Sequence, residues 1–179
     1  MQLSEKEKNE VRIDLARPED AQKAQLVFYL TWLDTYPNEE YGITREAIKN
    51  RFAKRLTREG LAEFAAKIAA PEPNTSFLVA RLGKKIIGVC RLRKDQEKNQ
   101  LSAIYVLPEF QRLGIGYRFW QEAKEFFDAG RDIIVQAAVY NDKAINFYKK
   151  LGFTDTGKRF TQPHGDIIIP EMEMIIKNQ

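Results

Sequence analysis

The sequence predicts an α+β domain in which a mixed, twisted sheet of about seven strands is flanked by helices on both faces. Apolar residues recur at every second position in several separate segments, as they do in half-buried strands. Between these segments, apolar residues recur with the spacing of amphipathic helices. Strands and helices occur partly in runs and partly in alternation, an order typical of α+β folds rather than of a fully parallel sheet.

The first third of the chain is expected to be mostly helical. Residues 11–16 alternate as a strand does, and Pro18, Glu19 and Asp20 then provide the residue types that start a helix. Helical spacing continues to residue 36, where the stretch PNEEYGI interrupts it. The helices predicted in this third cover residues 21–36, 45–56 and 58–70.

After residue 74 the apolar period changes from helical spacing to two. The expected strands cover residues 76–83, 84–94, 101–107, 132–139, 153–160 and 166–177, with helices over 115–129 and 142–151. Gly83 marks the turn of a hairpin. Because the helix 115–129 connects strands 100–107 and 132–139, these two strands are predicted to be parallel neighbours joined by a right-handed crossover. The other strands are predicted to be antiparallel.

Composition limits the function classes. A chain of 179 residues, 44% of them hydrophobic, suits one domain, which we place at residues 11–179 after a flexible, polar segment 1–10. The 29 basic and 25 acidic residues are scattered, which argues against nucleic acid as a partner. No apolar stretch reaches the ~20 residues of a membrane span, so no membrane partner is expected. The single cysteine, Cys90, predicts a buried thiol and a cytoplasmic location.

The stretch QRLGIGY (111–117) stands where a predicted strand passes into a predicted helix. The first turn of a helix has unpaired N–H groups, and glycines allow an anion to approach them without a Cβ in the way. The stretch lacks the Lys-Ser/Thr end of a P-loop and the third glycine of a dinucleotide fingerprint. An anion site of another kind and a simple glycine turn without a ligand are the two interpretations that remain.

Two blocks of this sequence resemble motifs of the GNAT superfamily of acyl-CoA N-acetyltransferases. The run LSAIYVLPEFQRLGIG (101–116) is similar to motif A, with Gln111, Gly114 and Gly116 at its three defining positions. The run VYNDKAINFYKKLGF (139–153) is similar to motif B. Its matching residues are Asn141, Ala144, Phe147, Tyr148, Leu151, Gly152 and Phe153. Residues 21–70, where such proteins vary their acceptor site, match no specific pattern.

The resemblance implies a GNAT-type sheet with a splayed parallel strand pair at its centre, acetyl-CoA as co-substrate, and no metal. The residues it assigns to the coenzyme are Ile104, Tyr105, Val106, Gln111, Arg112, Leu113, Gly114, Ile115, Gly116, Tyr117, Asn141, Ala144 and Tyr148. Two of them have other interpretations that stay open. Arg112 is compatible with an ordinary surface arginine, and Asn141 with the N-cap of the following helix.

The resemblance also makes Tyr148 the catalytic acid that protonates the departing thiolate, although an aromatic residue packed in the core would look the same in the sequence. The strand of motif A carries no carboxylate, so the general base must come from elsewhere or act through water. The candidates are Asp34, Glu39, Glu40, Glu173 and His164, the last expected in the loop between the final two strands.

The stretch TWLDTYPNEEYGIT suggests an acceptor site, with Trp32, Asp34 and Tyr36 as substrate-binding residues. Carboxylates and aromatic rings together can bind an amine, so a small primary amine such as a polyamine is the expected acceptor. A helix edge beside a solvated acidic loop is the simpler alternative. Protein N-terminal or lysine acetylation, and a non-catalytic acyl-CoA-binding regulatory domain, are alternative functions, and a homodimer is a candidate assembly.

Overall fold

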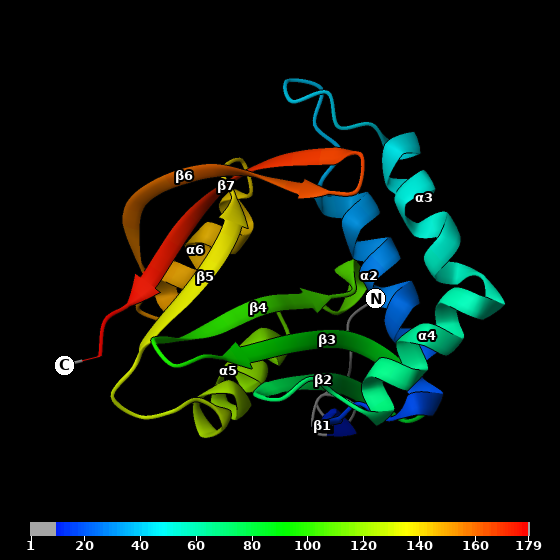
Figure 1. Cartoon of the computed structure of the whole chain (residues 1–179), viewed down its shortest axis with the longest axis horizontal. Helices are drawn as coiled ribbons and strands as arrows, with labels where there is room; N and C mark the ends of the chain where they lie inside the picture. Colours follow the sequence, from blue (N-terminus) through cyan, green and yellow to red (C-terminus); the bar gives the residue numbers. More distant parts are fainter. Residues whose placement is uncertain (1–9, 179) are drawn as a thin grey trace.

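The computed structural model describes residues 10–178 and contains one seven-stranded sheet (Figure 1). Its strand order is β1-β2-β3-β4-β5-β7-β6. The strands are β1 (Arg12–Leu15), β2 (Thr75–Leu82), β3 (Lys85–Lys94), β4 (Lys98–Val106), β5 (Asp132–Ala138), β6 (Thr154–His164) and β7 (Ile167–Ile176). Every pairing is antiparallel except that of β4 with β5, as predicted. The segment expected to be flexible, 1–10, falls outside the described residues except for Glu10.

Five α-helices that lie wholly within residues 10–178 cover the two faces of this sheet. They are α2 (Ala21–Thr35), α3 (Arg45–Ala53), α4 (Arg58–Ala69), α5 (Ile115–Phe126) and α6 (Asp142–Lys150), with short 3-10 turns η1 (Pro18–Asp20), η2 (Lys54–Leu56) and η3 (Pro108–Phe110). In Figure 1, α5 and α6 lie behind the sheet, and α3 and α4 lie on the viewer's side. Thr44 and Thr57 cap α3 and α4, their hydroxyls accepting from backbone N–H groups at 3.0 and 3.1 Å.

The parallel pair β4–β5 is hydrogen-bonded over only part of its length. Pairing runs from Lys98 with Asp132 to Leu101 with Val135 and then stops, although β4 continues to Val106. The register with β3 shifts at the same place and leaves Ser102 as an extra residue on β4. The predicted splay therefore begins at a bulge, and the two ribbons diverge from that point in Figure 1.

Two hydrophobic clusters hold the molecule together. The larger one fills the sheet and its contacts with α5 and α6, and it includes Cys90, whose thiol is fully buried as expected. Burial raises the pKa of this thiol, which makes it a poor nucleophile. The second cluster joins α2 and α3 to β5 and β7; its buried members are Trp32, Leu33, Tyr36, Ile43, Ile48, Phe52, Ala138, Ile167 and Ile169. Residues 10–178 include no helix long and apolar enough to cross a membrane.

Candidate active site

The glycine loop leads from β4 into α5 through two residues in the left-handed region. Gly114 caps α5 with φ of +79°, and Arg112 has φ of +63°, which is uncommon for a residue with a side chain. A Cβ built on Gly114 would meet no atom within 4 Å. The space beside Gly114 is therefore open at the start of α5, where the first N–H groups of a helix have no helical partners.

Gly116 has a different structural reason. A Cβ at this position would lie 3.0 Å from Cζ of Phe147, so the glycine allows α5 and α6 to pack closely through that ring. Of the two glycines in the motif, Gly114 leaves room for a ligand and Gly116 makes room for a neighbouring helix. Leu113 and Ile115 pack toward the core, while Arg112 and Tyr117 are exposed beside the loop.

The edge of β4 that β5 leaves unpaired begins after Leu101 and includes Ile104, Tyr105 and Val106. One of its groups is already in use, because the Gln111 side-chain amide donates a 3.1 Å hydrogen bond to the Val106 carbonyl. This bond ties the glycine loop to the end of β4. Backbone groups of a strand point alternately to its two sides, so those of Ile104 face this open edge and can pair with an extended ligand, whereas those of Tyr105 face Val89 on β3.

Tyr148 lies on α6 and is 6% exposed, with its ring against Phe147 and Phe153 at centroid distances of 5.5 and 5.7 Å. Among the described residues its hydroxyl makes no hydrogen bond, yet the oxygen is not sealed from solvent. Burial, followed by the nearby Tyr105 and Cys90, raises the pKa of this phenol. The ring is therefore part of the core, while the hydroxyl is an available, fully protonated donor at neutral pH.

Asn141, at the end of β5, caps α6. Its side-chain oxygen accepts a 3.1 Å hydrogen bond from the N–H of Ala144, which is the structural interpretation offered by the sequence. The amide nitrogen of Asn141 has no partner among the described residues, so it can still donate to a ligand.

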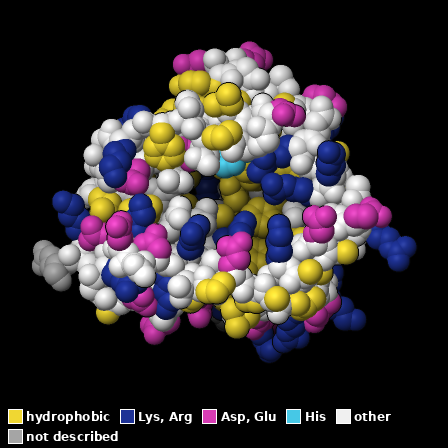
Figure 2. All heavy atoms as spheres, in the orientation of Figure 1, with side chains coloured by type: hydrophobic (Ala, Val, Ile, Leu, Met, Phe, Trp, Pro, Cys, Tyr) yellow, Lys and Arg dark blue, Asp and Glu magenta, His cyan; other side chains and the backbone are white. Residues whose placement is uncertain are grey.

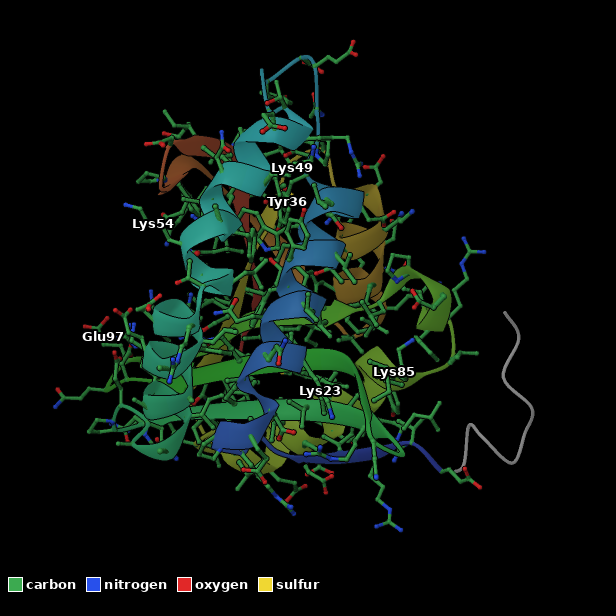
Figure 3. All side chains as sticks on the ribbon, turned by 90° about the vertical axis from the view of Figure 1, so that its right-hand side faces the viewer. Lys23, Tyr36, Lys49, Lys54, Lys85 and Glu97 are labelled. Carbon is green, nitrogen blue, oxygen red and sulfur yellow. The ribbon has the colours of Figure 1, made fainter. Side chains whose placement is uncertain are left out.

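The opposite side of the splay carries the aromatic residues predicted at the acceptor site. Tyr36 follows α2 and lies beside α3 (Figure 3), and its hydroxyl is 2.8 Å from that of Tyr105 on β4. Trp32 packs on Tyr36 with ring centroids 4.4 Å apart. Burial is the main cause that raises the pKa of both tyrosine hydroxyls. The structure thus brings Trp32 and Tyr36 together on the wall next to β4.

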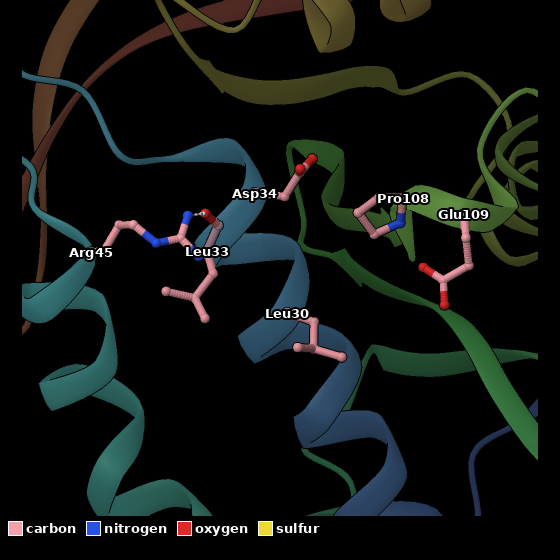
Figure 4. Close-up of a pocket in the computed structure, with 6 residues that line it drawn as sticks. All are labelled: Leu30, Leu33, Asp34, Arg45, Pro108 and Glu109. Atoms are coloured by element: carbon pink, nitrogen blue, oxygen red, sulfur yellow. Dashed lines mark hydrogen bonds between the residues drawn. The ribbon is translucent and has the colours of Figure 1, made fainter.

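Asp34 lies elsewhere. It is exposed and lines a separate surface pocket of about 280 Å³, together with Leu30, Leu33, Arg45, Pro108 and Glu109 (Figure 4). Because Asp34 and Trp32 are two positions apart on α2, their side chains point in different directions around the helix. Glu39 and Glu40 are also exposed, in the turn after α2. These three carboxylates are therefore not gathered with Trp32 and Tyr36.

The carboxylate that the structure places near Trp32, beside His164, is a buried one that the sequence analysis did not predict. Glu171 on β7 is 8% exposed, and its Oε1 is 3.2 Å from Nε2 of His164, whose ring lies 5.3 Å from Trp32. His164 is the last residue of β6 rather than part of a loop, because it pairs with Ile167 across a tight turn. The alternation in PEMEMII was the available signal, since Met172 and Met174 face the core and Glu171 and Glu173 face the other way. Glu173 is paired with Lys158 at 3.0 Å.

Figure 2 shows a hollow in this face, in the space between β4 and the β6–β7 hairpin of Figure 1. Hydrophobic side chains line its depth, and Lys and Arg side chains gather beside it. Tyr105 belongs to both hydrophobic clusters, so it forms part of the boundary between this acceptor face and the splay.

Comparison with known proteins agrees with this geometry. Residues 33–175 match the family model for the acetyltransferase (GNAT) domain. A probable N-acetyltransferase of Mycobacterium tuberculosis is 27% identical over 173 residues, which are 90% of this chain and 91% of that protein. An N-alpha-acetyltransferase of Sulfurisphaera tokodaii is 28% identical over 120 residues, 63% of this chain and 71% of its own. The PaiA N-acetyltransferase of Thermoplasma acidophilum, in complex with coenzyme A, has the same fold. Its TM-score is 0.71 at 21% identity, over 94% of this chain and 99% of that one.

The chain therefore belongs to the GNAT family of acetyltransferases. It is an acetyl-CoA-dependent N-acetyltransferase, as the two sequence blocks indicated. Among residues 10–178, no group of three or more His, Cys, Asp or Glu side chains is arranged to hold a metal ion.

Proposed function

We propose that this enzyme transfers the acetyl group directly to a primary amine bound on the acceptor face, between Tyr105 and the Glu171–His164 pair. The observation that carries this proposal is the position of Tyr105. It stands on the unpaired part of β4, and its hydroxyl meets Tyr36 from the acceptor face. The coenzyme edge and the acceptor face are thus two sides of one strand.

The coenzyme supplies an acetyl thioester. The open backbone at Gly114 would hold its pyrophosphate, helped by the N-terminal end of the α5 dipole. The unpaired edge at Ile104 would hydrogen-bond the amide-containing arm in the splay, with the free amide nitrogen of Asn141 at the start of α6 on the opposite side. These contacts orient the reactive end toward the acceptor face.

Tyr148 would donate a hydrogen bond to the sulfur as the carbon–sulfur bond breaks. A phenol with a raised pKa remains protonated at neutral pH, so the donor is always present. A raised pKa also disfavours complete loss of the proton, so the hydroxyl must regain a proton within each turnover. Solvent returns this proton to the phenol oxygen, and the amine releases one proton to solvent through the base as the carbon–nitrogen bond forms, so each turnover moves one proton from nitrogen to sulfur overall.

Glu171 and His164 would accept the proton from the amine, directly or through one water molecule. Their 3.2 Å contact allows the carboxylate to fix the orientation of the imidazole. Both groups face the side of the sheet that carries Trp32. Because Asp34, Glu39 and Glu40 lie away from these residues, they are weaker candidates for this role than the pair on the β6–β7 hairpin.

A small amine is our preferred acceptor because the acceptor face is built around buried aromatic side chains, Trp32 and Tyr36, which suit a compact ligand. A protein N-terminus is the second candidate, favoured by the name of the Sulfurisphaera tokodaii relative, N-alpha-acetyltransferase. The test is thiol release from acetyl-CoA across small amines, amino acids, aminoglycosides, polyamines and N-terminal peptides, with mass spectrometry of the product. Acetylated amine supports the proposal. Tight coenzyme binding without transfer to any acceptor would favour a non-catalytic, acyl-CoA-binding role.

A further inference from the structure

Three arginines converge on the acceptor face without a carboxylate among them. Arg51 on α3 and Arg55 on η2 are one helical turn apart, and Arg91 comes from β3. Among residues 10–178, none of the three forms a salt bridge, whereas Arg81, Arg131 and Arg159 each pair with an aspartate. Several exposed arginines also lack partners, and Arg55 and Arg91 are exposed too, so the distinguishing residue is the partly buried Arg51.

Arg51 is the most constrained of the three. Its guanidinium stacks 4.5 Å above the Trp32 ring, and its Nε atom is sealed from solvent with no hydrogen-bond partner in the described chain. Burial and the neighbouring Arg55 lower its pKa to about 10, so the group is still charged at neutral pH. A Cβ on Gly165 would lie 3.5 Å from its Nη1, so the turn of the β6–β7 hairpin comes close to it. A buried charge held in this way costs free energy unless an anion compensates it.

Arg55 and Arg91 extend this positive charge along the face. The guanidinium of Arg55 lies 5.5 Å from the Phe52 ring. Loss of hydration, followed by the charge of Arg91, lowers the pKa of Arg55. Arg91 pairs in register with Ala103, one residue beyond the Ser102 bulge where β4 and β5 separate. The charge therefore runs from α3 to the mouth of the splay.

The ring of Trp32 separates this charge from the opposite one. Arg51 stacks above it, while the His164 ring meets it edge-on at 5.3 Å with Glu171 behind. A carboxylate and a cluster of guanidinium groups thus face one hollow from two sides. An acceptor that carries both an amine and an oxyanion would complement both, whereas a polyamine would bring additional positive charge against the arginines.

We infer that the natural acceptor is a small molecule bearing a carboxylate or phosphate close to its primary amine, with Arg51, Arg55 and Arg91 as the residues that select the oxyanion. This inference rests on the proposed function, because it concerns the acceptor of the same reaction. Arginine suits the role, since its planar fork can donate two parallel hydrogen bonds to either oxyanion.

Matched acceptors test it. Thiol release is measured with amino acids against their amides, 4-aminobutanoate against butylamine, and phosphoethanolamine against ethanolamine. At least one anionic member should have kcat/KM at least about tenfold above its neutral partner. A preference in the first two pairs indicates recognition of a carboxylate, and a preference in the third pair indicates recognition of a phosphate. Arg51→Gln should remove most of this preference by raising KM for the anionic member more than for its neutral partner. Arg12→Gln, an exposed arginine on the far edge strand β1, should leave the preference intact.

Equal use of both members of every pair would overturn the inference and leave the proposed function standing. Transfer to none of the amines, including peptides and polyamines, would overturn the proposed function and the inference with it. Because Arg51→Gln could lose stability along with its stacking on Trp32, Arg91→Gln on the exposed side of β3 provides the second variant. If Arg91→Gln folds normally and both single variants, Arg51→Gln and Arg91→Gln, keep the full preference for the anionic acceptor, the arginines do not select the acceptor.

Discussion

The hydroxyl groups of Tyr36 and Tyr105 lie 2.8 Å apart, although 69 positions separate the two residues in the chain. Tyr36 follows α2, and Tyr105 stands on the part of β4 that β5 leaves unpaired. This single hydrogen bond therefore fixes the acceptor wall against the strand on which the coenzyme is expected to lie.

Tyr36→Phe should remove this bond while keeping the ring. A net hydrogen bond of this kind contributes about 0.5–1.5 kcal/mol, so the free energy of unfolding should fall by about that amount in urea titrations. Tyr29→Phe is the matched control, because Tyr29 packs against the same hydrophobic cluster as Tyr36 but its hydroxyl has no hydrogen bond within residues 10–178. Equal losses in the two variants would mean that the Tyr36–Tyr105 bond adds nothing to stability.

Asp20 should make the stability depend on pH. It is 3% exposed and accepts two 2.9 Å hydrogen bonds from Arg81, which help to lower its pKa in spite of burial. A lowered folded-state pKa means that its stabilisation is complete above the unfolded value of about 3.9 and is lost as pH falls through the folded one. Asp20→Asn should therefore lower the free energy of unfolding by about 2–3 kcal/mol at pH 7 and progressively less below pH 4.

The control for this variant is Asp166→Asn in the exposed β6–β7 turn, which should change stability by less than about 0.5 kcal/mol. A loss for Asp20→Asn that stayed constant down to pH 2 would show that the charge of Asp20 is not what stabilises the fold.

Gly114 tests the phosphate site. Gly114→Asp adds a negative charge at the open start of α5 and should weaken coenzyme A binding at least about tenfold, or 1.4 kcal/mol, in calorimetry. Gly114→Asn adds a side chain of nearly the same shape, also tolerated at positive φ, without the charge. Its affinity should fall less. Unchanged affinity in a folded Gly114→Asp variant would rule out this loop as the pyrophosphate site.

Glu171 and Glu173 are the two carboxylates of β7 that face the acceptor side, and replacing each in turn tests which of them is the base. If Glu171 and His164 accept the amine proton, Glu171→Gln should lower kcat about 10²-fold or more at pH 7, since general-base catalysis typically contributes that much. The deficit should shrink at high pH, where the free amine predominates in solution. Glu173 is equally buried but pairs with the exposed Lys158 rather than with His164, so Glu173→Gln should retain most activity. If Glu173→Gln lowered kcat more than Glu171→Gln, Glu173 rather than Glu171 would be the base.

Much of this site could be predicted from the chain. The order of strands and helices, the parallel pair and the glycine loop all depend on local patterns, and the structure contains them near the expected residues. Strand β4 begins at Lys98 rather than residue 101, and β6 reaches His164 rather than ending at 160. In both cases the neighbouring strand pairs with the extra residues, whose polar side chains did not indicate a strand in the sequence.

The acceptor face was harder to predict, because it is assembled from side chains far apart in sequence. The alternation of Glu and Met along β7 indicates the face on which Glu171 lies, but only the fold brings this face to His164 and leaves Glu39 in solvent. The same holds for Arg51 and Arg91, which reach one another's neighbourhood only through the packing of α3 and η2 on the sheet. Gly116 matched its motif, but its packing against Phe147 depends on a contact that the motif does not describe.

Tyr148→Phe tests the proposed chemistry most directly. The substitution removes one oxygen that has no hydrogen bond among the described residues and keeps a ring packed on Phe153, so folding and coenzyme affinity should change little. The rate of acetyl transfer in a single turnover should fall about 10²-fold or more, because general acid catalysis typically contributes 10²-fold to 10⁴-fold. An unchanged single-turnover rate in a folded Tyr148→Phe enzyme would contradict the account, since water or the acceptor would then protonate the sulfur and Tyr148 would only support the core.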